Sequence, residues 1–214
     1  MIWRRTGAVL LLVALALGSR VHPAAGQSRP ATAGAFGGYV HNEHRWSREV
    51  DTEAVGGLVL GAWVDAPTPL GWFSVTAEGA YAQRGGDARF DPAIVPGAFG
   101  VSPIRTDVLT FSVLPRATVS LRLVDLHVAT GPTLDYVLHS RLDPVLEPIL
   151  EEVTTGFAWT LAAGARVAVG EGYVAEVEAR IVEGLRDAYR GDVLSLQDRS
   201  LELVLRVGTV LRRD

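Results

Sequence analysis

The chain of 214 residues has no cysteine and no lysine, and Asn42 is its single asparagine. Without cysteine there is no disulfide framework, no thiolate metal site, no cysteine nucleophile and no lipid attachment through an N-terminal cysteine. Without lysine, all 20 basic residues are arginines, and 24 acidic residues outnumber them. A net negative charge gives no basic footprint for nucleic acid, so we expect no nucleic-acid partner.

The sequence also lacks an apolar run long enough to cross a bilayer as a helix, which takes roughly 20 residues. Its longest such run, residues 8–17, follows Arg4 and Arg5 and is broken by Gly18, Ser19 and Arg20. Small residues at 24–26 supply a cleavage point before Gln27. This pattern is typical of a secretory signal peptide.

We therefore predict a signal peptide over residues 1–26 and one exported domain over residues 27–214. Removal of the signal peptide takes away three basic residues, Arg4, Arg5 and Arg20, and no acidic residue. The 20 basic residues become 17 against 24 acidic ones, a net charge of −7.

Period-two alternation of apolar and polar residues recurs from Gly34 onward, with no convincing helical stripe, which predicts an all-β fold. Strands of soluble proteins are mostly five or six residues long, whereas a tilted strand that crosses a bilayer needs about 9 to 11. Most of the expected strands have about 9 to 15 residues. They cover residues 33–41, 53–64, 70–83, 106–118, 126–138, 154–168, 173–184 and 198–211.

The connections between these strands alternate between tight and long. Tight turns are expected at 65–69, 119–125 and 169–172, and long connections at 42–52, 84–105, 139–153 and 185–197. Outer-membrane barrels have short periplasmic turns and longer extracellular loops. The sequence therefore predicts an eight-stranded antiparallel up-and-down transmembrane β-barrel, located in the bacterial outer membrane.

Each expected strand has one apolar face and one small or charged face. We place the apolar faces against lipid and the charged faces in a lumen narrow enough to be filled by side chains. The predicted lumen charges are Glu78, Arg166, Glu176, Glu178, Arg180, Glu202 and Arg206, with Arg116 and Asp135 nearer the rims. The predicted aromatic girdles at the two membrane borders comprise Phe73, Tyr81, Tyr136, Phe157 and Tyr173.

The alternation alone also permits the opposite placement, in which the apolar faces point inward. The chain would then be an exported soluble barrel that binds an apolar ligand, as lipocalins do. Strand length, loop asymmetry and aromatic spacing favour the membrane barrel.

The pattern resembles the PorT-like outer-membrane β-barrel family, whose architecture is shared with small OmpA-like membrane anchors. The resemblance implies an integral outer-membrane barrel, with membrane lipid as a partner and no catalytic residues. The segments that carry it are Gly56–Gly61, Ser74–Tyr81 with Gln83–Gly85, Thr130–Tyr136, Ala162–Ala165, and Glu178–Arg180 with Glu183–Leu185. The sequence departs from that pattern at Val210–Asp214, because such barrels often end on an aromatic residue.

Few residues suggest chemistry. His41, Glu43 and His44, with Asp51 and Glu53, have the residue types of a metal site, but their spacing fits solvated loop residues. His139 and Ser140 would suit a lipid-modifying enzyme only if the chain had already left the strand, because adjacent strand residues face opposite sides. His127 is expected at the rim. We predict no enzyme activity, no metal and no cofactor.

The connection at 84–105 is unusually apolar for an exposed segment. It carries Phe90, Ile94, Val95, Phe99 and Val101 among prolines and glycines. Such a segment either folds over the barrel mouth or offers a contact surface to an envelope protein partner. We therefore expect a closed barrel with a structural or interaction role displayed through its long loops.

Overall fold

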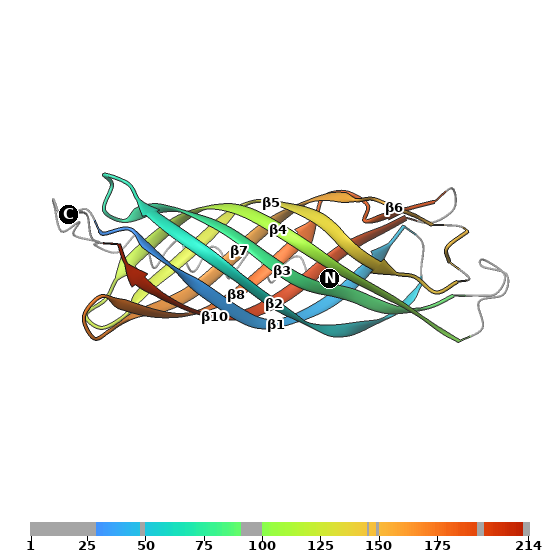
Figure 1. The fold of residues 1–214 in the computed structure, drawn as a ribbon, viewed down its shortest axis with the longest axis horizontal. Helices are drawn as coiled ribbons and strands as arrows, with labels where there is room; N and C mark the ends of the chain where they lie inside the picture. Colours follow the sequence, from blue (N-terminus) through green and yellow to red (C-terminus); the bar gives the residue numbers. More distant parts are fainter. Residues whose placement is uncertain are drawn as a thin grey trace, which may run out of the picture.

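A computed structural model describes residues 29–47, 50–90, 100–144, 146–148, 150–191 and 195–211. The predicted signal peptide at 1–26 lies outside these residues. Eight long strands pair antiparallel with their neighbours, and β1 closes the ring by pairing with β10 (Figure 1). They are β1 (Thr32–Trp46), β2 (Asp51–Pro67), β3 (Phe73–Arg89), β4 (Val101–Ser120), β5 (Asp125–Arg141), β7 (Thr155–Val169), β8 (Tyr173–Gly184) and β10 (Ser195–Val210).

The closed ring confirms the predicted eight-stranded antiparallel barrel. Two additional short strands, β6 (Glu151–Glu152) and β9 (Tyr189–Arg190), continue the sheet from the outer part of β10. The sequence did not reveal them, because two-residue strands carry no alternation. The described residues contain no helix that is long and apolar enough to cross a membrane.

The two ends of the barrel differ, as expected. One end, here the turn end, carries the tight connections 68–72, 121–124 and 170–172. The other, the loop end, carries the connections after β1, β3, β5 and β8 (Figure 1). The strands extend further toward the loop end than predicted. For example, Arg89 of β3 still pairs with Val101 of β4 inside the segment expected to be a loop. Polar residues continue the alternation there, and Asp87 and Arg105 form an ion pair on the outer wall at 2.7 Å.

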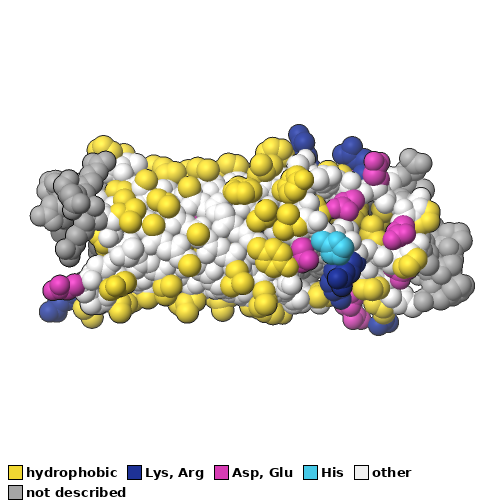
Figure 2. Space-filling view, viewed as in Figure 1, with side chains coloured by type: hydrophobic (Ala, Val, Ile, Leu, Met, Phe, Trp, Pro, Cys, Tyr) yellow, Lys and Arg dark blue, Asp and Glu magenta, His cyan; other side chains and the backbone are white. Residues whose placement is uncertain are grey.

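The outside of the wall is an apolar band. Leu203 is 58% exposed, Val177 53% and Phe157 43%. Figure 2 shows hydrophobic side chains along the middle of the barrel, with charged side chains gathered mainly toward the loop end. The wall thus has the polarity of a surface that faces hydrocarbon.

The interior changes character along the axis, and β10 shows both parts. Toward the turn end its inward residues include Glu202 and Arg206, with Val204 between them, whereas at the loop end they include Leu196. Leu196 belongs to a buried apolar group that we call the loop-end cluster. This cluster comprises Ala88, Phe90, Ile104, Leu146, Leu150, Tyr189 and Leu196. The barrel therefore has an apolar cap at its loop end, and below the cap a filling in which charged side chains pack against buried apolar ones such as Phe36, Trp63 and Val204.

One glycine shows how tightly the lumen is filled. Gly61 on β2 faces inward opposite Phe36 on β1. A Cβ at Gly61 would lie 2.6 Å from the Phe36 ring and 2.5 Å from the carbonyl oxygen of Gly79. Only glycine leaves room for that ring against the wall.

Candidate functional site

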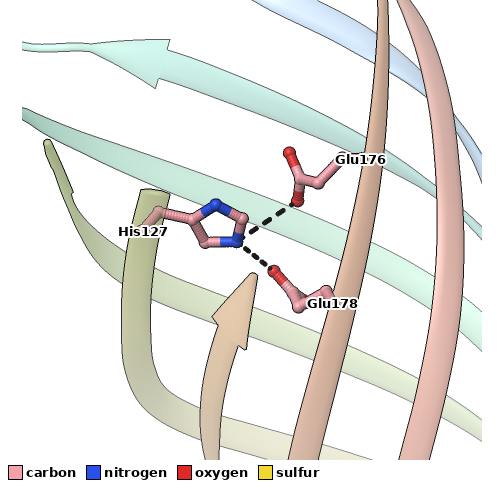
Figure 3. Close-up of side chains that lie close together, drawn as sticks. All are labelled: His127, Glu176 and Glu178. Carbon is pink, nitrogen blue, oxygen red and sulfur yellow. Dashed lines mark hydrogen bonds and ion pairs between the residues drawn. The ribbon is translucent and has the colours of Figure 1, made fainter. Parts of the chain in front are cut away.

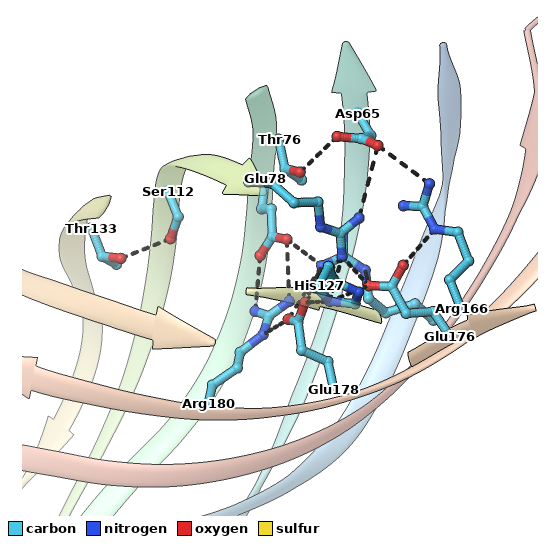
Figure 4. A network of polar contacts seen from close by, with 12 residues as sticks. Asp65, Thr76, Glu78, Ser112, His127, Thr133, Arg166, Glu176, Glu178 and Arg180 are labelled. Carbon is cyan, nitrogen blue, oxygen red and sulfur yellow. Dashed lines mark hydrogen bonds and ion pairs between the residues drawn. The ribbon is translucent and has the colours of Figure 1, made fainter. Parts of the chain in front are cut away.

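The lumen holds a connected set of charged side chains, which we call the charged network. Alternation along β8 turns Glu176, Glu178 and Arg180 to the same inward face, and each of the other long strands except β1 contributes one member. The members are Asp65 (β2), Glu78 (β3), Arg116 (β4), His127 (β5), Arg166 (β7), Glu176, Glu178 and Arg180 (β8), and Arg206 (β10). Figure 4 shows these side chains converging from several strands.

Glu178 lies at the centre of the network and is 1% exposed. Its carboxylate lies 2.9 Å from His127 Nε2 and accepts hydrogen bonds from Arg116 Nη2 at 3.2 Å and from Arg206 Nη1 at 3.3 Å. Arg180 also donates to it through Nε. The Glu178 carboxylate is therefore surrounded by three arginine side chains and one imidazole.

The other two glutamates repeat this arrangement. Glu78 accepts from Arg206 Nη1 at 2.6 Å and lies 2.8 Å from Arg180 Nη1. Glu176 accepts from Arg166 Nε at 2.8 Å and also contacts Arg116. An isolated buried charge would cost several kcal/mol. Because every carboxylate has two or more arginines, the network offsets its own desolvation.

Predicted lumen charges lie as follows. Glu78, Glu176, Glu178, Arg180, Glu202 and Arg206 are buried inside the barrel. Arg166 is also inside, toward the turn end, where it contacts Asp65 at 3.3 Å. Glu202 interacts electrostatically with Arg180 and Arg84.

Predicted girdle aromatics all lie on the outer wall. Tyr136, Phe157 and Tyr173 are exposed, while Phe73 and Tyr81 are half-buried there. Tyr81 donates its hydroxyl proton to Asp107 Oδ1 at 2.8 Å. Phe73 packs edge-on against Trp72.

Three residues expected at or near the rims lie deeper. Arg116 and His127 are buried members of the charged network, because the turn between β4 and β5 takes only residues 121–124 and leaves both residues inside the wall. Asp135 is buried in a second ion pair, in which Arg84 Nη1 donates to its Oδ2 at 2.6 Å. Arg84 was expected at the start of a loop.

Sequence reasoning also missed Asp65, which accepts from Thr76 Oγ1 at 2.9 Å and lies 3.3 Å from Arg166 Nη1. The signal was present, since Asp65 stands two residues from the inward Trp63 and shares its face. Arg84 likewise shares the inward face of Ala82. Extending the alternation past the apolar residues would have found both.

His127, Glu176 and Glu178 have the ligand types of a metal site, and their candidate ligand atoms all lie within 4.8 Å of one another (Figure 3). However, Arg116 Nη2 lies 2.8 Å from His127 Nε2 and also reaches both carboxylates. A guanidinium thus already supplies the cation at this position. The arrangement fits an internal ion pair better than a metal centre.

The other candidate groups are separated by strand alternation. His41 and Glu43 point outward, whereas His44 points into the lumen. His139 likewise points outward and Ser140 inward, where the Ser140 hydroxyl is 2.7 Å from the Tyr189 hydroxyl. Neither the metal group around His41 nor a His139–Ser140 catalytic pair is therefore assembled.

His44 instead meets Asp198 at the loop end, with 3.2 Å between Nε2 and Oδ1. Burial tends to raise the pKa of Asp198, but the hydrogen bond and charge of His44 and the charge of Arg84 outweigh burial and lower that pKa. A small cavity of about 30 Å³ lies beside this pair, lined in part by Arg84, Asp135 and Tyr189. It has room for roughly one or two water molecules.

No family model matches the chain, and no curated protein matches it in sequence. Solved structures share its fold. The outer membrane protein OprG from Pseudomonas aeruginosa is 9% identical with a TM-score of 0.60, covering 88% of this chain and 99% of its own. Neisserial surface protein A is 10% identical with a TM-score of 0.51, covering 85% of this chain and 99% of its own. The fold is therefore that of small eight-stranded outer-membrane barrels, while the PorT-like resemblance remains a prediction.

Proposed function

We propose that this protein is an integral outer-membrane barrel, closed by its own side chains, with a structural or interaction role at its loop end. The supporting observation is its inverted polarity, with leucines and valines outside and the charged network inside. On β4 the outward row from Leu109 to Val119 spans ten steps. At about 3.4 Å per residue and a tilt near 40°, this row is about 26 Å high, close to the apolar band of about 25 Å in such barrels.

The alternative of a soluble lipocalin-like carrier required the apolar rows to face the lumen. That orientation is wrong, because Leu201, Leu203, Val177 and Phe157 all lie on the outer surface. Among the described residues, the lumen is packed with arginine and glutamate side chains and with a buried apolar cluster that includes Phe36, Val40, Trp63 and Val204. In water, the exposed apolar band would instead be a large aggregation-prone surface.

The charged network and the loop-end cluster are the basis for proposing a closed lumen. Arginine and glutamate side chains from several strands meet at the axis, and Leu196, Ile104 and Leu146 fill the space above them. We interpret this filling as a structural plug.

The packing limits which residues of the segment 84–105 are available for the proposed contact with an envelope protein. Phe90 and Ile104 are buried in the loop-end cluster, so this part of the segment caps the barrel. Val101 and Pro103 face outward and are exposed. Ile94, Val95 and Phe99 lie outside the described residues.

Membrane fractionation tests the location. The chain is expected to remain with carbonate-washed outer membranes and to change its gel mobility on heating. Recovery in the soluble fraction would overturn the proposal.

Leu203→Arg should impair insertion, since an arginine facing lipid at the midplane costs about 2–4 kcal/mol, and Leu203→Ala is its matched control.

Two further measurements separate the parts of the proposal. In planar bilayers, conductance should not rise above that of the protein-free membrane, and a steady channel current would refute the closed lumen.

A photo-crosslinker at Val101 should capture a protein partner in intact cells, whereas one at Leu203 should capture only lipid. Capture of lipid alone at both positions would refute the protein contact.

A further inference from the structure

A β-bulge near the loop end changes which side chains of β5 face outward. Val108 pairs with Val137 and Asp107 with His139, so Leu138 is an extra residue opposite β4. Leu138 and His139 are both exposed, and from there the alternation turns Arg141 outward. Unbroken alternation would have pointed His139 and Arg141 into the lumen. Bulges commonly re-aim a side chain in this way.

The bulge brings two arginines together on the outer wall. Arg141 pairs in register with Arg105 of β4, and both face outward. Like charges directly opposite one another are destabilising in a sheet. Arg105 is partly neutralised by Asp87 at 2.7 Å. Arg141 donates from Nε to His139 Nε2 at 3.1 Å, and the ion pairs between described residues do not include it.

These side chains line a groove of about 390 Å³ in the outer wall, with Gln83 and Asp107 beside them. At the same height the register of β2 against β3 shifts by one residue between Ala54 and Val59, and Val55 and Gly56 of this stretch also line the groove. The groove lies at the loop-end edge of the apolar band, because outward Asp107 and His139 follow outward Leu109 and Tyr136 there. Figure 2 shows the same change from hydrophobic to charged side chains toward the loop end.

We propose that this groove binds the phosphorylated saccharide headgroup of a glycolipid in the outer leaflet. Paired guanidinium groups suit a phosphate, because each presents several donors in a fixed plane. His139 accepts from Arg141 at Nε2, and its ring also lines the groove. Asp107 and Gln83 provide partners for sugar hydroxyls. This inference rests on the proposed outer-membrane location.

The position of the groove also favours a lipid over a soluble sugar phosphate. Tyr136 and Leu138 are exposed on β5 immediately below His139. Below Asp107, β4 presents Leu109 and the exposed Phe111. A headgroup held by the arginines would therefore place its acyl chains along this apolar wall.

A second groove on β1, β8 and β10, of about 300 Å³, provides the comparison. Its arginine, Arg199, is bound to Glu183 at 3.3 Å, and Arg45 binds the same residue at 2.7 Å. Glu43 also lines this groove. Both of these arginines are in ion pairs with a carboxylate, whereas the ion pairs between described residues do not include Arg141, so the first groove is the better anion site.

The test uses the full chain purified in detergent micelles, with binding measured by native mass spectrometry. The probes are an acylated bisphosphorylated glucosamine disaccharide, its dephosphorylated form, and phosphatidylglycerol. Arg105→Gln and Arg141→Gln should each weaken binding of the bisphosphorylated lipid roughly tenfold, the value of one charge-assisted hydrogen-bonding group. Arg199→Gln should leave it unchanged. Each variant must retain the heat-dependent gel mobility of a folded barrel.

Equal weakening by Arg199→Gln would overturn the proposal, because binding would then follow overall charge. Equally tight binding of the dephosphorylated lipid or of phosphatidylglycerol would overturn the headgroup assignment. Unchanged binding of the bisphosphorylated lipid by the folded Arg141→Gln variant would likewise overturn the proposal. Since binding is measured in micelles, its failure is distinguishable from a failed fractionation experiment.

Discussion

Replacing Arg180 by leucine removes a guanidinium that is 5% exposed and bridges two glutamates. Removing one partner of a buried ion pair costs about 3–5 kcal/mol. We expect the lower end of that range, about 3 kcal/mol, because Glu78 keeps Arg206 at 2.6 Å and Glu178 keeps Arg116 at 3.2 Å. The lumen nevertheless loses one positive charge, which the remaining arginines cannot replace.

Urea unfolding in lipid vesicles, followed by tryptophan fluorescence at pH 8, measures this loss. With a slope of about 2 kcal/mol per molar urea, the midpoint should fall by about 1.5 M. The exposed Arg89→Leu is the matched control, since Arg89 pairs with Glu53 at 3.1 Å on the outer wall and exposed pairs contribute about 0.2–1 kcal/mol.

The double variant Glu78→Leu, Arg180→Leu makes the test specific. If the cost arises from a stranded carboxylate, removing Glu78 as well should recover part of the stability. An unchanged midpoint for Arg180→Leu would refute the inward placement of β8. Costs that simply add in the double variant would refute the pairing.

Three further predictions concern packing, hydrogen bonding and pH. Gly61→Ala should destabilise the barrel by about 1–3 kcal/mol through overpacking, while Gly79→Ala on the outer wall should be tolerated; equal effects would contradict the tight lumen. Tyr189→Phe removes hydrogen bonds to two hydroxyls at 2.7 and 2.8 Å and should cost about 1–2 kcal/mol in urea unfolding, whereas no loss would place the hydroxyl in solvent. The folded pKa of Asp198 lies below its ordinary value of 3.8, so its stabilising contribution is present above that value and lost as the pH falls through the folded pKa. The stability gap between wild type and His44→Leu should therefore be wide at pH 6 and narrow below about pH 4; a gap that stays equally wide would contradict this pairing.

The barrel could be predicted because each strand keeps one face for lipid. Along β10, Leu201, Leu203 and Leu205 alternate with Glu202 and Arg206, and the structure places the two sets outside and inside. The alternation of apolar and charged residues predicts the strands, and strand length and loop asymmetry predict which face points outward. The fold could therefore be predicted without knowing any individual side-chain contact.

The partners within the lumen could not be predicted. Glu78 and Arg206 are 128 residues apart in sequence, and only the closure and stagger of the barrel bring them together. The bulge at Leu138 has no sequence signature either, so the outward direction of Arg141 was invisible. At the loop end, outward Gln197 was assigned to the connection 185–197, whereas β10 already begins at Ser195.

The change in filling along the axis also specifies how each strand is set against its neighbours. A slip by one residue exchanges the two faces and is strongly disfavoured in any such wall. A slip by two residues preserves the faces, yet in β10 it would put Arg199 at the height of Leu201, in hydrocarbon, and move Leu196 out of its apolar surroundings. Every strand that carries this switch therefore encodes its own depth in the bilayer.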